Sequence, residues 1–263
     1  MFLGNKICIF VKVLYVLCGI MSKKLPLRLE KCPLVDALIE IRFESSIIGS
    51  AIFGIIYSLI RDDYKGTVTN LPILQVPEQI RRNDPNLRFK PLYRIEAEKY
   101  IIQIGDDVLC LSSKIPYVGW GEFSSRTIEL IKKVAREGII NRVLRIGHRY
   151  VNFFEGDIMD KLTISKPTIN GYQTNNVLVR TEVRDCDNFI DTIQITNSAA
   201  YKSPFHTESL SGSLIDIDSF KEYEDNYFLE NLESEINKVH ICEKNMFFSL
   251  LTDDFLDTLN PIY

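Results

Sequence analysis

The stretch LVDALIEIRF, residues 34–43, alternates between apolar and charged side chains. Every odd-numbered position from 35 to 43 is apolar, whereas Asp36, Glu40 and Arg42 stand at even-numbered positions. Successive side chains of a strand point to opposite faces of its sheet, so this pattern predicts a strand with one buried face. A second long strand is predicted from VLRIGHRYVNFF, residues 143–154. The fold is therefore expected to be organised around a sheet.

Outward from these two stretches, the chain alternates between helical and extended patterns. Apolar spacing predicts helices over residues 48–60 and 122–136, and one long or two consecutive helices over 223–259. Short strands are expected at 89–98, 100–104, 107–112, 177–184, 189–196 and 213–218, with irregular connections at 71–88, 156–174 and 199–212. This order predicts an α+β protein with a mainly antiparallel sheet and a long C-terminal helix. We expect two similar strand/helix halves, residues 21–140 and 141–263, packed as one compact body.

The composition is that of an ordinary globular protein, with 46% hydrophobic residues and a formal net charge of −4. The acidic balance argues against a nucleic-acid partner, because such proteins normally carry a basic excess. The six cysteines are widely spaced, with no close pair of the kind that zinc sites use, and we interpret most of them as reduced, apolar packing residues. Disulfide frameworks belong to short secreted chains, so we expect a cytoplasmic protein.

Residues 1–20, MFLGNKICIFVKVLYVLCGI, form an apolar stretch interrupted by Lys12. The stretch lacks the small-residue cleavage site that a signal peptide needs. As a transmembrane helix it would carry Lys12 near its centre, which is unfavourable in a membrane. Met21 begins MSKKLPLRLEKCP, which resembles an ordinary N-terminus. We therefore favour a mis-assigned start, with an anchor or signal and an apolar N-terminal helix packed on the body as the alternatives. A membrane association is expected only if residues 1–20 are translated.

The candidate site residues are Arg145, Arg149, Asp216 and Asp218. Strand alternation places Arg145, Gly147 and Arg149 on one face, and His148, Tyr150 and Asn152 on the other. The gap at the glycine suits an anion or a carboxylate, and paired aspartates suit a metal or acid–base chemistry. The alternative is that the arginines pair with acidic groups across the sheet, which would account for both features.

Motifs for catalysis and cofactors are missing from the sequence. No HExxH motif surrounds the histidines, and no phosphate loop or nucleophile elbow occurs. His240 falls on the apolar face of the last predicted helix, which favours a hydrogen-bonded core histidine over a ligand. His206 lies in a serine-rich loop. We therefore predict no catalytic residue, no metal site and no cofactor.

Several segments together resemble a sporadically distributed, uncharacterised family of bacterial and archaeal proteins of about this length. They are PLVDA at 33–37, EIRF at 40–43, YVGW at 117–120, RIGHRYVN at 145–152 and LIDID at 214–218, with His240 and Phe247 in the last predicted helix. The resemblance runs from Lys24 to Leu259 and implies a shared scaffold that begins where Met21 does. It implies no activity and no catalytic residue. The patchy distribution of the family implies genes on mobile or defence-related islands.

These observations favour a non-enzymatic binding or interaction protein. We expect a partner or sensor subunit of a bacterial accessory system, of a defence or toxin–antitoxin-like kind, with a protein partner or homo-oligomer. The alternative is a small-ligand or nucleotide-binding protein, or an enzyme, with a site between the two halves at the four candidate residues. Convergence of these side chains in a concave pocket would favour the alternative, and mutual pairing would favour the first hypothesis.

Overall fold

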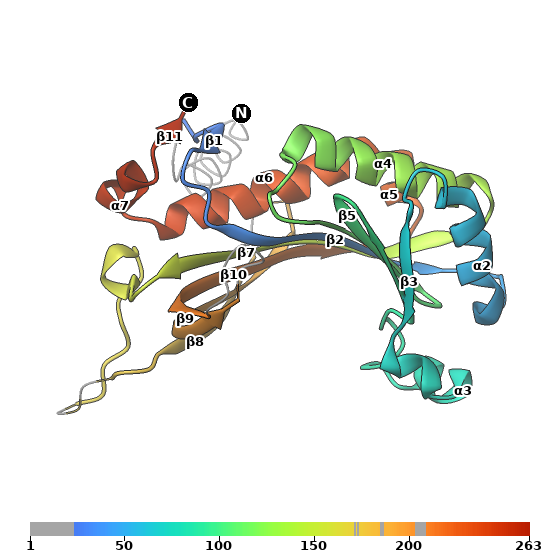
Figure 1. The fold of residues 1–263 in the computed structure, drawn as a ribbon, viewed down its shortest axis with the longest axis horizontal. Helices are drawn as coiled ribbons and strands as arrows, with labels where there is room; N and C mark the ends of the chain where they lie inside the picture. Colours follow the sequence, from blue (N-terminus) through green and yellow to red (C-terminus); the bar gives the residue numbers. More distant parts are fainter. Residues whose placement is uncertain (1–23, 171, 173, 185–186, 203–208) are drawn as a thin grey trace, which may run out of the picture. The chain divides into compact units, whose positions relative to one another are not determined.

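The computed structural model describes residues 24–170, 172, 174–184, 187–202 and 209–263, shown as a ribbon in Figure 1. The apolar stretch at 1–20 therefore lies outside the described residues. The chain divides into two units, one formed by the N-terminal residues up to Cys32 with Asp253–Tyr263, the other by Pro33–Thr252. In the first unit, β1 (Arg28–Leu29) pairs antiparallel with β11 (Pro261–Ile262), and α7 (Asp253–Thr258) precedes β11.

The larger unit is organised around one nine-stranded sheet of order β3-β4-β5-β6-β2-β7-β10-β9-β8, in which every neighbouring pair is antiparallel. Its strands are β2 (Leu34–Glu44), β3 (Gly66–Asn70), β4 (Tyr93–Ala97), β5 (Tyr100–Ile104), β6 (Val108–Ser113), β7 (Arg142–Glu155), β8 (Leu178–Arg184), β9 (Ile190–Tyr201) and β10 (Leu210–Glu222). The two stretches from which the sheet was predicted, β2 and β7, are paired at its centre.

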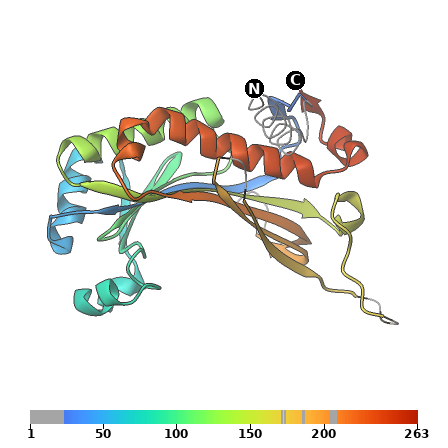
Figure 2. The same ribbon diagram turned by 180° about the vertical axis from the view of Figure 1, so that it is seen from behind.

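Helices cover one face of this sheet, as both views of the ribbon show (Figures 1 and 2). They are α2 (Gly49–Ile60), α4 (Trp120–Arg136), α5 (Tyr227–Glu230) and α6 (Leu232–Leu250). The longest, α6, packs on β7, β9 and β10, while α4 contacts both α2 and α6. Two 3-10 turns, η1 (Pro72–Gln75) and η2 (Met159–Lys161), and the short α3 (Glu78–Asn83) lie in the connections.

The core lies between the sheet and these helices. Ala37, Ile39, Ile41 and Phe43 of β2 are almost fully buried, while the positions between them are partly exposed. The predicted alternation is therefore present. Burial of these apolar side chains, at roughly 1.5–3 kcal/mol for each large one, is the main energy that holds the helices on the sheet.

The α+β class with a mainly antiparallel sheet is confirmed, and three local predictions need correction. The connection predicted at 71–88 contains η1 and α3, and β3 precedes it. The loop predicted at 199–212 is shorter, because β9 reaches Tyr201 and β10 begins at Leu210. The helical region at 223–259 consists of α5, α6 and α7 in place of one or two helices.

The similarity of the two predicted halves stays a prediction. The boundary between residues 140 and 141 falls between α4 and β7, within one unit and one sheet. A helix, α2, follows β2, whereas η2 and then β8 follow β7. Among the described residues, no helix combines the length and the apolar character needed to cross a membrane.

Candidate functional site

The central strand β7 carries polar side chains on both faces, and they form two separate groups. Arg145 and Arg149 point to the face of the sheet that lacks α4 and α6, here called the open face. His148 is buried on the helix-covered face, where it is 0% exposed. The two groups therefore have different surroundings, although they alternate along one strand.

On the open face, Arg145 joins two carboxylates from neighbouring strands. Its Nη1 donates to Glu40 Oε1 of β2 at 3.0 Å, and its Nη2 donates to Asp218 Oδ2 of β10 at 3.0 Å. The guanidinium also lies over the ring of Phe220, 4.2 Å from its centroid, in cation–π contact. The side chain of Arg145 is only 10% exposed, so both ion pairs are shielded from water on one side.

Gly147 makes this arrangement possible. Arg149 is the direct neighbour of Asp218 across the strands, so Arg145 reaches Asp218 only by extending across Gly147. A Cβ atom at Gly147 would lie 2.9 Å from Arg145 Nη1 and 3.2 Å from Asp218 Oδ1. The gap predicted between the two arginines is therefore filled by the chain's own guanidinium and carboxylate.

Arg149 forms a bidentate pair with Asp216. Its Nε and Nη2 donate to the two carboxylate oxygens at 2.7 and 2.6 Å. Hydrogen bonding to Asp216 raises the pKa of Arg149. Burial raises the pKa of Asp218, although the positive charge of Arg145 opposes this shift. Burial likewise raises the pKa of nearby Asp36, and there the charge of Arg149 opposes it. The structure thus brings all four predicted residues to one face, as two ion-paired groups.

Neither pair leaves a reactive group at this place. The Glu40 carboxylate also accepts from Arg42 Nε at 2.7 Å and from the thiol of Cys110 at 3.8 Å. Burial raises the pKa of Cys110 well above its usual value, which keeps the thiol protonated and unreactive. Both arginines form ion pairs with carboxylates of the chain, so their positive charge is already balanced without a bound anion.

The open face continues beyond the ion pairs as a polar surface. The strand registers align Thr192 and Gln194 of β9 with Asp218 and Asp216 of β10. On the edge strand β8, Arg180 and Glu182 stand next in line, and both side chains are more than half exposed. At the opposite end, Arg42 and Arg88 both contact the ring of Phe89.

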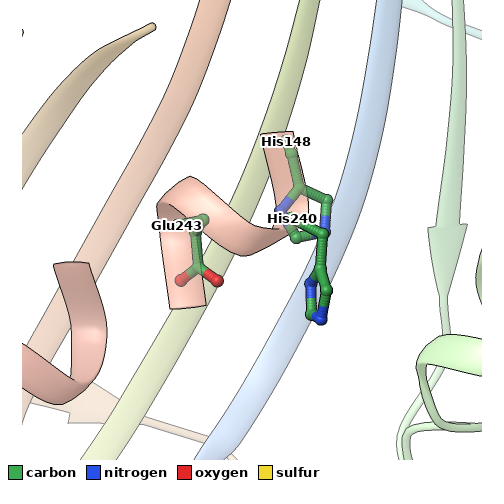
Figure 3. A group of neighbouring side chains, drawn as sticks. All are labelled: His148, His240 and Glu243. Carbon is green, nitrogen blue, oxygen red and sulfur yellow. The ribbon is translucent and has the colours of Figure 1, made fainter. Parts of the chain in front are cut away.

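The second polar group is buried between β7 and α6 (Figure 3). His148 comes from β7, while His240 and Glu243 lie three residues apart on α6. One nitrogen of each histidine and one carboxylate oxygen all lie within 4.8 Å of one another. Glu243 is 1% exposed and His240 is partly exposed, so the cluster is closed to bulk water at His148 and Glu243.

Aromatic rings enclose the two histidines. Trp120 stacks on His240 with ring centroids 3.8 Å apart, and the ring of Tyr150 meets that of His148 at 4.3 Å. Burial lowers the pKa of His148 well below its usual value and that of His240 to about 3, so both imidazoles are neutral. Burial also raises the pKa of Glu243 well above its usual value.

The sequence prediction did not select this group. It placed His148 opposite the arginines, which the structure confirms, but it expected His240 to be hydrogen-bonded, and His240 Nδ1 has no partner. Glu243 is not among the predicted site residues. The available signal was the spacing of His240 and Glu243, which places both on one face of a helix. His206 lies outside the described residues.

A scan against protein-family models and a search of curated proteins found no match for this chain. The family resemblance expected from the motifs is therefore untested. The positions that carry it nevertheless have structural roles, since Gly147, Arg145 and Asp218 form one packed group.

Proposed function

We propose that the protein is a non-enzymatic binding protein that recognises a protein partner through the open face of its sheet. The supporting observation is the self-pairing of Arg145, Arg149, Asp216 and Asp218. Four charged residues that formed a ligand or catalytic site would direct unsatisfied groups at a common point. Here each arginine is balanced by the chain's own carboxylates, as expected for residues that hold three strands together.

The surface properties of the open face support recognition of a protein. Between β2 and β8 this face carries acidic, basic and neutral polar side chains beside apolar ones such as Phe220, so a partner would need complementary charges in a fixed pattern. Such patterns contribute specificity and association rate more than affinity. A place in a bacterial accessory system, which the family resemblance implies, remains part of this proposal.

The test compares charge changes on the open face with one on the helix side. Arg180→Glu and Glu182→Lys alter the open face at the edge strand β8, away from the two central ion-paired groups. Lys132→Glu alters the outer surface of α4, where Lys132 pairs with Glu233. Each protein is used for affinity capture from cells of the native host, followed by measurement of the affinity for the recovered protein.

The expected result is a stoichiometric partner that Lys132→Glu retains and that both open-face variants bind at least tenfold more weakly. Equal binding by all three variants would show that the open face is not the interface. Recovery of no stoichiometric partner, together with no self-association in solution, would contradict the proposed function itself.

A further inference from the structure

Among the described residues, six buried side-chain nitrogen or oxygen atoms have no hydrogen-bond partner. Five of them belong to His148, His240 and Glu243, and the sixth is Asn152 Nδ2 on the same face of β7. Buried polar atoms are nearly always hydrogen-bonded, because leaving one without a partner costs its full desolvation energy. Their concentration at one point therefore needs a specific explanation.

We propose that His148, His240 and Glu243 bind a divalent transition-metal ion through two imidazole nitrogens and one carboxylate oxygen. This ligand set is one that zinc and non-haem iron use in proteins. An imidazole offers a cation the lone pair of the ring nitrogen that carries no proton. A bound ion would satisfy one nitrogen of each histidine and an oxygen of Glu243 together.

The distances are compatible with such an ion. Ligand atoms at about 2.0–2.1 Å from a tetrahedral zinc ion lie about 3.3 Å from one another. The three candidate atoms lie within 4.8 Å of one another, so binding requires only small rotations of the side chains. The stacked Trp120 and the neighbouring Tyr150 limit the motion of the imidazole rings, which keeps the ligands close to this geometry.

A cation would offset the cost of burying Glu243. This side chain is 1% exposed, and neither of its oxygens receives a hydrogen bond. A carboxylate buried without a partner is costly, and a bound cation beside it offsets that cost.

The competing explanation is a protonated Glu243 that donates a hydrogen bond to His148 without any metal. The structure contains no such hydrogen bond, and this arrangement would leave His240 Nδ1 without a partner. The two explanations differ in a measurable way. Only the metal site predicts stoichiometric binding that requires both histidines and the carboxylate.

The experiment uses the full chain without a histidine tag. The protein is stripped with a chelator and titrated with Zn²⁺ by calorimetry, and with Co²⁺ by visible absorption. We expect one ion per chain and a cobalt spectrum without thiolate charge-transfer bands, since the site contains no sulfur. His148→Gln and Glu243→Gln should each weaken binding by at least about 100-fold, because losing even an outer partner of a ligand costs about 10–100-fold.

Two matched controls separate the site from other ligands. Glu235→Gln changes another fully buried carboxylate of α6, which has hydrogen-bond partners, and should retain the ion. His206→Ala changes the only other histidine of the sequence and should also retain it. If a ligand variant does not fold, imidazole nitrogen NMR of the wild type replaces it, and two of the three histidines should shift on adding Zn²⁺.

Three results would overturn the metal site. They are wild-type binding no tighter than that of Glu243→Gln, a cobalt spectrum dominated by thiolate bands, and an imidazole spectrum in which Zn²⁺ moves fewer than two histidines. None of them bears on the open face, so the proposed partner-binding function stands or fails separately.

Discussion

Removing the bidentate pair between Arg149 and Asp216 is expected to destabilise the protein by more than an exposed pair on the same face would. Asp216 is 8% exposed and Arg149 is 43% exposed, and two short hydrogen bonds join them. Exposed ion pairs contribute about 0.2–1 kcal/mol, whereas removing one partner of a buried pair costs about 3–5 kcal/mol. A half-shielded bidentate pair should fall between these limits, with a coupling energy of about 2 kcal/mol.

The assay is a double-mutant cycle measured by urea unfolding, with Arg149→Ala, Asp216→Ala and the double variant. Arg180 and Glu182 provide the matched control, because they lie on the same face, are more than half exposed and meet at 3.5 Å. Their coupling should be no more than about 0.5 kcal/mol. If the coupling energy at Asp216 does not exceed that of the control, these charges do not hold the strands together, and the ligand-binding alternative gains.

Further expectations concern acid stability, the core and the glycine of β7. Burial opposes ionisation of Glu235, but hydrogen bonds from Lys238, Tyr223 and Lys221 outweigh it and lower the pKa of Glu235 in the folded state. The ionised Glu235 therefore stabilises the fold fully above its unfolded-state pKa. This stabilisation is lost as the pH falls through the folded-state pKa. Urea unfolding between pH 3 and 7 should therefore show a weaker pH dependence in Glu235→Gln, and an unchanged profile would contradict this. Phe43→Ala should reduce the free energy of unfolding by about 3–5 kcal/mol, and Leu178→Ala, at an exposed position, by less than about 0.5 kcal/mol. Gly147→Ala should cost about 1–2 kcal/mol, because its Cβ would approach Arg145 Nη1. In an Arg145→Ala background that loss should largely disappear, and persistence of the full loss would place the strain elsewhere.

The sequence predicted those parts of the fold whose periodicity is local. Alternation in residues 34–43 and 143–154 was sufficient to find β2 and β7 and to assign the faces of β7 correctly. It missed the strand β3, whose side chains are exposed on both faces and therefore carry no alternation. The first residues of β10, Leu210–Gly212, fall within a predicted loop, because their pairing with β9 and β7 is not visible in local composition.

The site was only partly predictable for a related reason. Arg145 and Asp218 could be proposed as partners because strand alternation assigns each side chain to a definite face of the sheet. The meeting of His148 with His240 and Glu243 depends on how α6 crosses β7, a tertiary arrangement that no local period encodes. Among the described cysteines, Cys110 and Cys242 are buried as expected of packing residues, whereas Cys32 is exposed. The contact of Cys110 with Glu40 could not be predicted from its strand alone.

Comparison of Glu235 with Glu243 indicates why the buried cluster is not an accident of packing. Both carboxylates lie on α6 and are almost fully buried. Glu235 accepts hydrogen bonds from Lys221, Tyr223 and Lys238, so this fold supplies donors to a carboxylate that it buries. Neither oxygen of Glu243 receives a hydrogen bond, although each neutral imidazole beside it carries one N–H. An ion held by one nitrogen of each histidine and one oxygen of Glu243 would give each of the three side chains a partner.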